Sequence, residues 1–167
     1  MIALASVLGA LAAMWEVFQG PPFDIPFPLY TRISWDLTGV PIILSTLFYG
    51  ITAGTYTCLI GCSIIFFRGN IAGGVFKLIA ELATLIGFSL VKRSIWLRIT
   101  IAIILRVVVM TIGNYFLLPF FYEMQEPVVV GLLLFIGIFN LTQALINIIP
   151  AYHIFTIVDS KVKASVD

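Results

Sequence analysis

Amide side chains recur along one stripe of an apolar segment near the C-terminus. Asn140, Gln143 and Asn147 are spaced i, i+3 and i+7, which places them on one face of an α-helix. Asn114 lies near the end of the preceding apolar segment. Such amides either join helices through hydrogen bonds or form the polar wall of a pocket, and the sequence allows both. A pocket of this kind, surrounded by apolar side chains, suits a flat, neutral, hydrogen-bonding heteroaromatic ligand.

Four charged side chains, Glu16, Lys77, Glu81 and Arg106, stand within or beside apolar segments. An unpaired charge in hydrocarbon costs ~2.5 kcal/mol or more, so each needs a partner or a water-filled cavity. Lys77 and Glu81 are four residues apart and can face one another on a helix, while a pair between Glu81 and Arg106 is equally allowed. Internal pairing and ligand binding are the two alternatives for these charges. Lys77, which should lie nearest the outer face, is the candidate for ligand contact.

Other reactive side chains do not form a catalytic or metal-binding pattern. His153 is the only histidine, and no nucleophile is placed with a base. Cys58 and Cys62 are one helical turn apart with no histidine nearby, which favours small packing residues over a metal pair. No glycine-rich loop carries the Lys-Ser/Thr pair that binds phosphates. We therefore expect no enzyme, no metal site and no ATP site.

The composition places these residues in a membrane protein. Of the 167 residues, 61% are apolar and 10% are charged, and the mean hydropathy is +1.14. A water-soluble domain carries about 25% charged residues, so the lipid bilayer is the expected solvent. The net charge of +1, with nine scattered basic residues, argues against a nucleic-acid partner. At roughly 20 residues per span, the chain has room for about six helices and for no soluble catalytic domain.

The predicted fold is an all-α integral membrane protein, a single six-transmembrane-helix bundle over residues 1–167. The apolar runs are continuous instead of alternating, which argues against a membrane β-barrel. The first run has no basic residues before it, so we expect a retained helix and not a cleaved signal peptide. Breaks at proline, glycine and charged residues delimit the expected helices at 2–18, 37–50, 53–67, 71–91, 96–118 and 128–155.

The loop charges predict the orientation in the cell membrane, because basic residues near span ends stay in the cytoplasm. Two basic residues, Arg32 and Arg68, fall on one side of a six-span arrangement. The other side carries Lys92, Arg93, Arg98, Lys161 and Lys163. Both termini are therefore predicted to be cytoplasmic. The segment from Gly20 to Tyr30, with four prolines, then forms a stiff aromatic loop on the outside.

A ridge of small residues runs along the first predicted helix. Ala5, Gly9 and Ala13 recur every four residues, and Ser6 and Ala10 form a second row beside them. Small residues let another helix approach closely. The ridge either packs inside the same bundle or docks a separate membrane subunit, and we expect docking.

Four stretches, taken in order, resemble the substrate-binding S components of energy-coupling-factor (ECF) vitamin transporters, most closely the riboflavin-specific group. Residues 33–41 (Ile-Ser-Trp-Asp-Leu-Thr-Gly-Val-Pro) are similar to the hydrophobic-Asp-x-x-x-Val-Pro start of that group's second helix. Residues 72–75 (Ala-Gly-Gly-Val) are similar to its Gly-Gly-Val start of helix four. Residues 114–119 (Asn-Tyr-Phe-Leu-Leu-Pro) and 139–141 (Phe-Asn-Leu) are similar to its Asn-Tyr-Phe and Phe-Asn-Leu motifs. The ridge resembles the alanine motif by which S components dock on their scaffold subunit.

This resemblance implies a subunit that captures a vitamin from outside, beneath the loop between helices one and two. It implies partners as well: a transmembrane scaffold (T component) and a pair of ATPases, which drive the subunit to topple in the membrane. Asn114 and Asn140 match the family's ligand-binding asparagines. Riboflavin, the first choice of ligand, would be transported cargo, and no resident cofactor is expected. The candidate ligand-binding residues are Asn114, Asn140, Gln143, Lys77, Asp36 and Tyr30.

The chain also departs from the family pattern at three positions. Gln143 stands where the family often has lysine, and Lys77 and Ala80 replace its usual glutamate and asparagine. Another vitamin or precursor, such as hydroxymethylpyrimidine, pantothenate or thiamine, therefore stays as an alternative. A membrane scaffold or facilitator without transport partners is the competing class, in which amides and ridge only hold helices together. Ligand binding separates the two classes.

Overall fold

The computed structural model describes residues 2–18, 20 and 24–164. Over this part of the chain it contains six α-helices and one two-stranded hairpin, so the predicted all-α, six-helix fold is confirmed. In chain order the elements are α1 (Ile2–Val17), β1 (Asp24–Pro26), β2 (Ser34–Asp36), α2 (Gly39–Tyr49), α3 (Ile51–Phe67), α4 (Ile71–Leu90), α5 (Ile95–Tyr122) and α6 (Glu126–Ala164).

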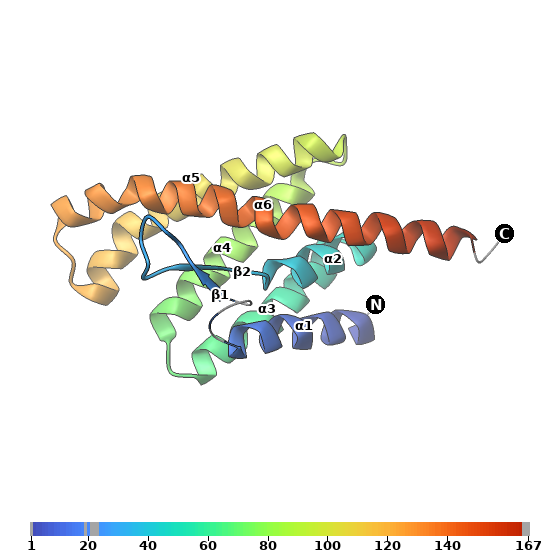
Figure 1. Ribbon diagram of the computed structural model, residues 1–167, viewed down its shortest axis with the longest axis horizontal. Helices are drawn as coiled ribbons and strands as arrows, with labels where there is room; N and C mark the ends of the chain where they lie inside the picture. Colours follow the sequence, from blue (N-terminus) through green and yellow to red (C-terminus); the bar gives the residue numbers. More distant parts are fainter. Residues whose placement is uncertain (1, 19, 21–23, 165–167) are drawn as a thin grey trace.

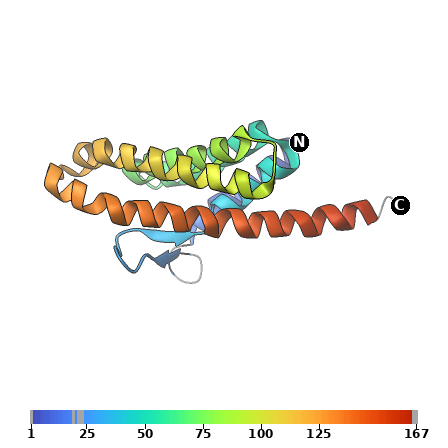
Figure 2. The same ribbon diagram turned by 90° about the horizontal axis from the view of Figure 1, so that it is seen from above.

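Successive helices run up and down the bundle, as Figure 1 shows. The two chain ends and the α4–α5 loop lie at one end, which we call the terminal end. The β1–β2 hairpin, the α3–α4 turn and the α5–α6 turn lie at the other, which we call the hairpin end. Helix α1 packs against α3, α4 against α5, and α2 against both α3 and α6. The hairpin lies against one face of the bundle beside α6 (Figure 2).

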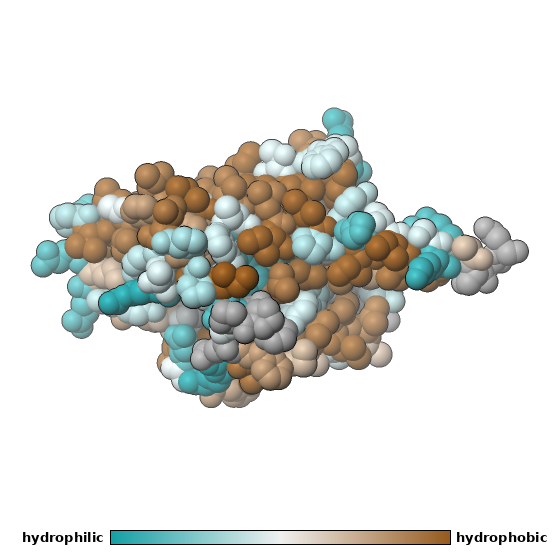
Figure 3. All heavy atoms as spheres, viewed as in Figure 1, coloured by the Kyte–Doolittle hydropathy of each residue, from teal (hydrophilic) through white to brown (hydrophobic). Residues whose placement is uncertain are grey.

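Three helices, α4, α5 and α6, are long and apolar enough to cross a membrane. The other three are apolar but shorter, with 16, 11 and 17 residues. On the face drawn in Figure 3, hydrophobic residues predominate along the helices, and the most hydrophilic residues gather toward the ends. This distribution fits a protein whose sides contact lipid and whose ends contact water.

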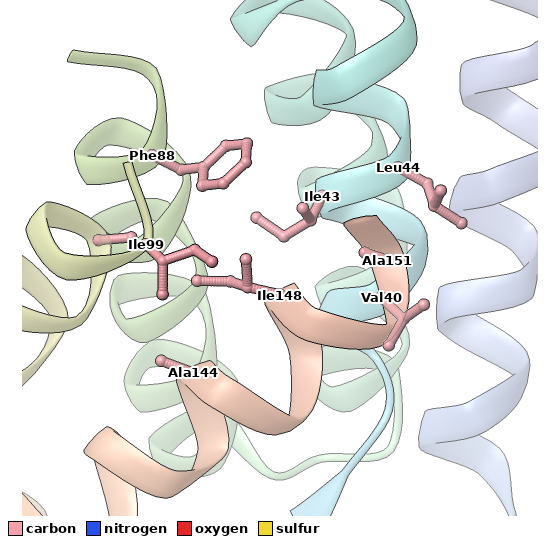
Figure 4. Close-up of a cluster of buried hydrophobic side chains, with 9 residues drawn as sticks. Val40, Ile43, Leu44, Phe88, Ile99, Ala144, Ile148 and Ala151 are labelled. Carbon is pink, nitrogen blue, oxygen red and sulfur yellow. The ribbon is translucent and has the colours of Figure 1, made fainter. Parts of the chain in front are cut away.

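The largest of three buried hydrophobic clusters among the described residues lies toward the terminal end, where side chains of four helices meet (Figure 4). Small residues of α6 and branched or aromatic residues of the neighbouring helices interdigitate there. The labelled members are Val40, Ile43, Leu44, Phe88, Ile99, Ala144, Ile148 and Ala151. Close packing at this end ties α2, α4, α5 and α6 together, and the hairpin end is left to hold a cavity.

The small-residue ridge of α1 faces the inside of the bundle, which corrects the expectation that it docks another subunit. Ala5 and Gly9 are buried, and a Cβ atom placed on Gly9 would lie 2.8 Å from the Cβ of Ile60 on α3. Thr57 of α3 donates a hydrogen bond to the backbone oxygen of Ala5 at 3.1 Å. Ala13 is half-buried. The small residues bring α1 and α3 close together, as the alternative interpretation held.

Two helices are longer than predicted, because proline and charge end an apolar run without ending a helix. Helix α5 continues through Pro119, which removes only one backbone donor. It ends where Glu123 adopts a left-handed φ of 52° and donates its N–H to the oxygen of Pro119 at 3.0 Å. Helix α6 runs to Ala164, past the predicted end at 155, and an Asp159–Lys163 pair at 2.7 Å spans its last turn.

The proline-rich loop contains regular structure that its composition did not predict. Strand β1 pairs antiparallel with β2, with Ile25 opposite Trp35 and Pro26 opposite Ser34. Proline is tolerated in this position because a two-stranded hairpin has only edge strands. The hairpin presents β2 to α6 and continues directly into α2.

Candidate ligand-binding site

A cavity of about 690 Å³ lies beneath the hairpin, between α1, α4, α5 and α6. This volume is within the range of pockets that enclose vitamin-sized molecules. Aromatic side chains, including Trp15, Phe76 and Phe139, form part of its wall. All six residues that the sequence predicted as ligand-binding also border it: Tyr30, Asp36, Lys77, Asn114, Asn140 and Gln143.

Gln143 of α6 holds the hairpin through the backbone of β2. Its Nε2 donates to the backbone oxygen of Asp36 at 2.7 Å, and its Oε1 accepts the N–H of the same residue at 3.3 Å. The side chain is 1% exposed. Because the amide pairs with the backbone of one residue through both of its ends, Gln143 acts first as an anchor for the lid.

Lys77 of α4 binds carboxylates of two other elements instead of Glu81. Its Nζ contacts Asp36 of β2 and lies 3.2 Å from Oε1 of Glu16, at the end of α1. Burial raises the pKa of Asp36, but the Lys77 ammonium and hydrogen bonds lower it by more, so the pKa lies below its ordinary value. The cluster ties α1, β2 and α4 together at the mouth of the cavity.

Thr38 completes this cluster and does not cap α2 with its side chain. Its hydroxyl donates to Oε1 of Glu16 at 2.7 Å, and its N–H donates to Oδ1 of Asp36 at 2.9 Å. The carboxylate of Asp36 therefore receives both a lysine and a backbone donor. Such an arrangement gives two acidic side chains hydrogen-bond donors at the edge of an apolar bundle.

Arg106 of α5 is the centre of a second, deeper network. Its Nη1 lies 3.0 Å from Oε1 of Glu81 and donates to the hydroxyl of Thr84 at 2.9 Å. Its Nε donates to Oδ1 of Asn140 at 3.1 Å. Arg106 is 2% exposed and Glu81 is fully buried. Of the two pairings that the sequence allowed for Glu81, the structure contains the interhelical one.

The two asparagines at the cavity wall are held by their own helices. Asn114 donates from Nδ2 to the backbone oxygen of Met110 at 2.7 Å, and Asn140 donates to that of Ile136 at 2.9 Å. The oxygen of Asn140 accepts from Arg106, as described above. The oxygen of Asn114 has no partner among the described residues and borders the cavity.

Asn147, the third amide of the α6 stripe, lies deeper and does not border the cavity. It is fully buried, and neither atom of its amide has a hydrogen-bond partner among the described residues. A Cβ atom on Gly39 would lie 2.3 Å from its Nδ2 and 2.7 Å from Oε2 of Glu81. Only glycine fits at the start of α2 beside these two polar groups.

Aromatic side chains of the hairpin pack against α6. Phe27 is 2% exposed, and its ring centroid lies 5.2 Å from that of Trp35 and 5.5 Å from that of Phe139. The indole Nε1 of Trp35 donates to the hydroxyl of Thr142 on α6 at 2.9 Å. Hydrophobic contact and directed hydrogen bonds therefore both hold the lid closed over the cavity.

Sequence reasoning identified Arg106 and Glu16 as charges that need a partner or a ligand, but it did not include them among the ligand-binding residues, and it gave Trp35 no role. Arg106 shares a helix face with Asn114, at a spacing of i and i+8, and this shared face is a signal that was present. Trp35 reaches Thr142 of α6 only through the path of the hairpin, for which the sequence carries no comparable signal.

Comparison with known proteins shows which solved structure has a similar fold. No protein-family profile matches the sequence, and no curated protein matches it either. A solved structure, described as the S component of a bacterial ECF transporter, matches with a TM-score of 0.75 and 22% sequence identity. The match covers 99% of this chain and 96% of that one. The protein therefore has the membrane fold seen in that S component, over essentially its whole length.

Proposed function

We propose that the protein is the substrate-capturing S component of an ECF-type importer and that it binds a neutral heteroaromatic vitamin, riboflavin by first choice. The observation that carries the proposal is the 690 Å³ cavity, where polar side chains of α4, α5 and α6 meet beneath the hairpin. The shared fold supports the same class. Hydroxymethylpyrimidine, pantothenate and thiamine are the alternative ligands.

The charge balance of the cavity favours a neutral ligand. Lys77 lies between two carboxylates, those of Asp36 and Glu16, and Arg106 is paired with Glu81. Together with Asp24, Arg32 and Arg68, which also border the cavity, these groups comprise four positive and four negative charges, so the charges sum to zero. A ligand that brought its own charge beside Lys77 or Arg106 would meet groups that already have oppositely charged partners, and it would bear the cost of desolvation. Flat ring faces would contact the aromatic wall, and ring edges would meet the amides.

Delivery requires partners, because capture beneath a lid does not by itself move a ligand against a gradient. We infer a transmembrane scaffold subunit and a pair of ATPases as those partners. Since Ala5 and Gly9 are buried, the scaffold would meet the outward face of α1. The exposed residues of that face include Ala3, Val7 and Ala10, which are small or apolar.

Titration of the purified protein with riboflavin tests the proposal. We expect binding at micromolar concentration or below. Asn114→Ala would remove a ligand acceptor and weaken binding roughly tenfold to hundredfold. Gln125→Ala, an exposed amide outside the cavity, is the matched control and should bind as the unaltered protein does.

Mass spectrometry of small molecules retained through detergent purification identifies the ligand independently. If another vitamin binds in place of riboflavin, the proposed substrate is wrong, but the proposed class, an S component of an importer, is retained. If no vitamin binds, the chain is a membrane scaffold or facilitator, and the transporter proposal is wrong.

A further inference from the structure

Arg106 is oriented by three neighbours that leave one of its nitrogens unused. Glu81 and Thr84 engage Nη1, and Asn140 engages Nε. Among the described residues no group accepts a hydrogen bond from Nη2. This nitrogen is also not one of the enclosed polar atoms that lack a partner, and Arg106 borders the cavity. The free edge of the guanidinium therefore opens onto the cavity.

A donor at the wall of the cavity favours a ligand that brings an acceptor, because a ligand that covers this nitrogen without accepting its hydrogen bond leaves a buried polar group unpaired. The guanidinium is planar and is held on two sides, so the direction in which Nη2 donates is set by the protein. Its positive charge is already balanced by Glu81 at 3.0 Å. The matching ligand group is therefore a neutral acceptor, such as a ring carbonyl, and not a second anion.

We propose that Arg106 is a ligand-contacting, specificity-determining residue whose Nη2 donates to a ring carbonyl oxygen of the captured molecule. The inference rests on the proposed function and deepens it, since it assigns the substrate class: flat heteroaromatic rings that carry a carbonyl group. Asn140 is then a positioning residue, because its oxygen accepts from Nε and fixes the plane of the guanidinium.

Asn114 lies on the same face of α5, eight residues further along, and presents a free oxygen to the same cavity. Eight helical residues correspond to a rise of about 12 Å. The donor of Arg106 and the acceptor of Asn114 are therefore placed to read two separated parts of one elongated molecule. A fused three-ring system with a polar substituent has this shape.

Two probes of similar shape test the role of Arg106. Lumiflavin has a three-ring system with two carbonyl groups, and phenazine has three fused rings with none. The unaltered protein should prefer lumiflavin by about tenfold or more. Arg106→Lys keeps the charge opposite Glu81 but lacks the planar Nη2 donor. We expect the affinity of this variant for lumiflavin to be about tenfold lower than that of the unaltered protein. Its affinity for phenazine should change by no more than about twofold.

Folding of each variant is checked by thermal melting and gel filtration. If Arg106→Lys does not fold, the charge-neutral double variant Glu81→Gln with Arg106→Gln replaces it, because that variant leaves no unpaired buried charge. An equal loss of affinity for both probes would make Arg106 purely structural. A preference for lumiflavin below about threefold in the unaltered protein would also overturn the inference, without any variant. If neither riboflavin nor lumiflavin binds the unaltered protein, the proposed function itself is wrong, and the inference falls with it.

Discussion

Gly39 occupies a point where α2 meets the buried polar groups of two other helices. The amide of Asn147 and the free oxygen of Glu81 both lie closer to its missing Cβ position than atoms of a real side chain approach. Asn147 and Glu81 are fully enclosed. The absence of a side chain at residue 39 therefore allows the carboxylate that orients Arg106 to lie where it does.

Gly39→Ala should destabilise the protein by about 1 to 3 kcal/mol, because the added methyl group must displace two fully buried polar side chains. Thermal melting in detergent measures the change. Gly137→Ala on α6 is the matched control, since a Cβ atom there meets nothing within 4 Å. The control should be neutral or slightly stabilising. Equal melting temperatures for the two variants would show that the α2 contact is not tight.

The hairpin is the element that closes the cavity, and two helices hold it. On α6, Gln143 binds the hairpin backbone and Thr142 accepts a hydrogen bond from Trp35, and on α4, Lys77 binds Asp36. In each of these contacts the partner of the hairpin is a side chain of a helix. An isolated two-stranded hairpin is only marginally stable. Its closed position therefore depends on side chains of the helices, and the rate of ligand exchange should depend on the same contacts.

Trp35→Phe removes the hydrogen bond to Thr142 and keeps an aromatic ring against Phe27. We expect the riboflavin dissociation rate to rise about twofold to tenfold, in line with one lost hydrogen bond of ~0.5 to 1.5 kcal/mol. Stopped-flow fluorescence measures this rate. Trp96→Phe, at a position that is 74% exposed, is the control and should leave the rate unchanged. Unchanged exchange in Trp35→Phe would mean that this bond does not hold the lid.

Most basic residues of the loops and chain ends lie at one end of the molecule, whereas Arg32 and Arg68 lie at the hairpin end. The α4–α5 loop, with Lys92 and Arg93, lies at the terminal end of the bundle, whereas Glu123 lies at the α5–α6 turn at the hairpin end (Figure 1). In a membrane, the basic end is expected to face the cytoplasm. The cavity would then open toward the outside, where a captured vitamin comes from.

Cysteine labelling tests this orientation. In a background in which Cys58 and Cys62 are replaced by alanine, a membrane-impermeant reagent applied from outside should modify Glu123→Cys and spare Lys92→Cys. The physical reason is the positive-inside bias of the loops. Labelling of Lys92→Cys but not of Glu123→Cys would show that the molecule has the opposite orientation in the membrane.

The outward face of α1 is the remaining surface of that helix for a scaffold subunit. Ala10→Trp places a large side chain on this exposed face and should abolish uptake while leaving riboflavin binding within about twofold. Uptake by cells that carry the whole transporter, with binding measured on purified protein, separates the two effects. Ile104→Trp, on the exposed face of α5, is the control and should transport normally. Normal uptake by Ala10→Trp would show that the scaffold subunit does not dock on this face of α1.

The order of helices and loops could be predicted from the sequence, because hydropathy is local. An apolar run of helical length, broken by Arg68, Gly69 and Asn70 or by the charges near residue 92, predicts its own ends to within a few residues. The polar amides of the cavity wall were also predictable, because a polar side chain in an apolar helix must turn inward. Asn114, Asn140 and Gln143 could therefore be placed at one site before any packing was known.

Only the tertiary structure decided which of these groups pair. Glu81 has Lys77 one turn away on its own helix, yet it binds Arg106, 25 residues further along the chain. That choice depends on the rotation and height of α4 relative to α5, which are set by packing of whole helices and not by local sequence. The same holds for the ridge of α1, where Ala5 and Gly9 permit a close helix contact and packing selects α3 as the neighbour. Composition and periodicity determine which side chains turn inward, and the relative placement of helices determines what each one meets.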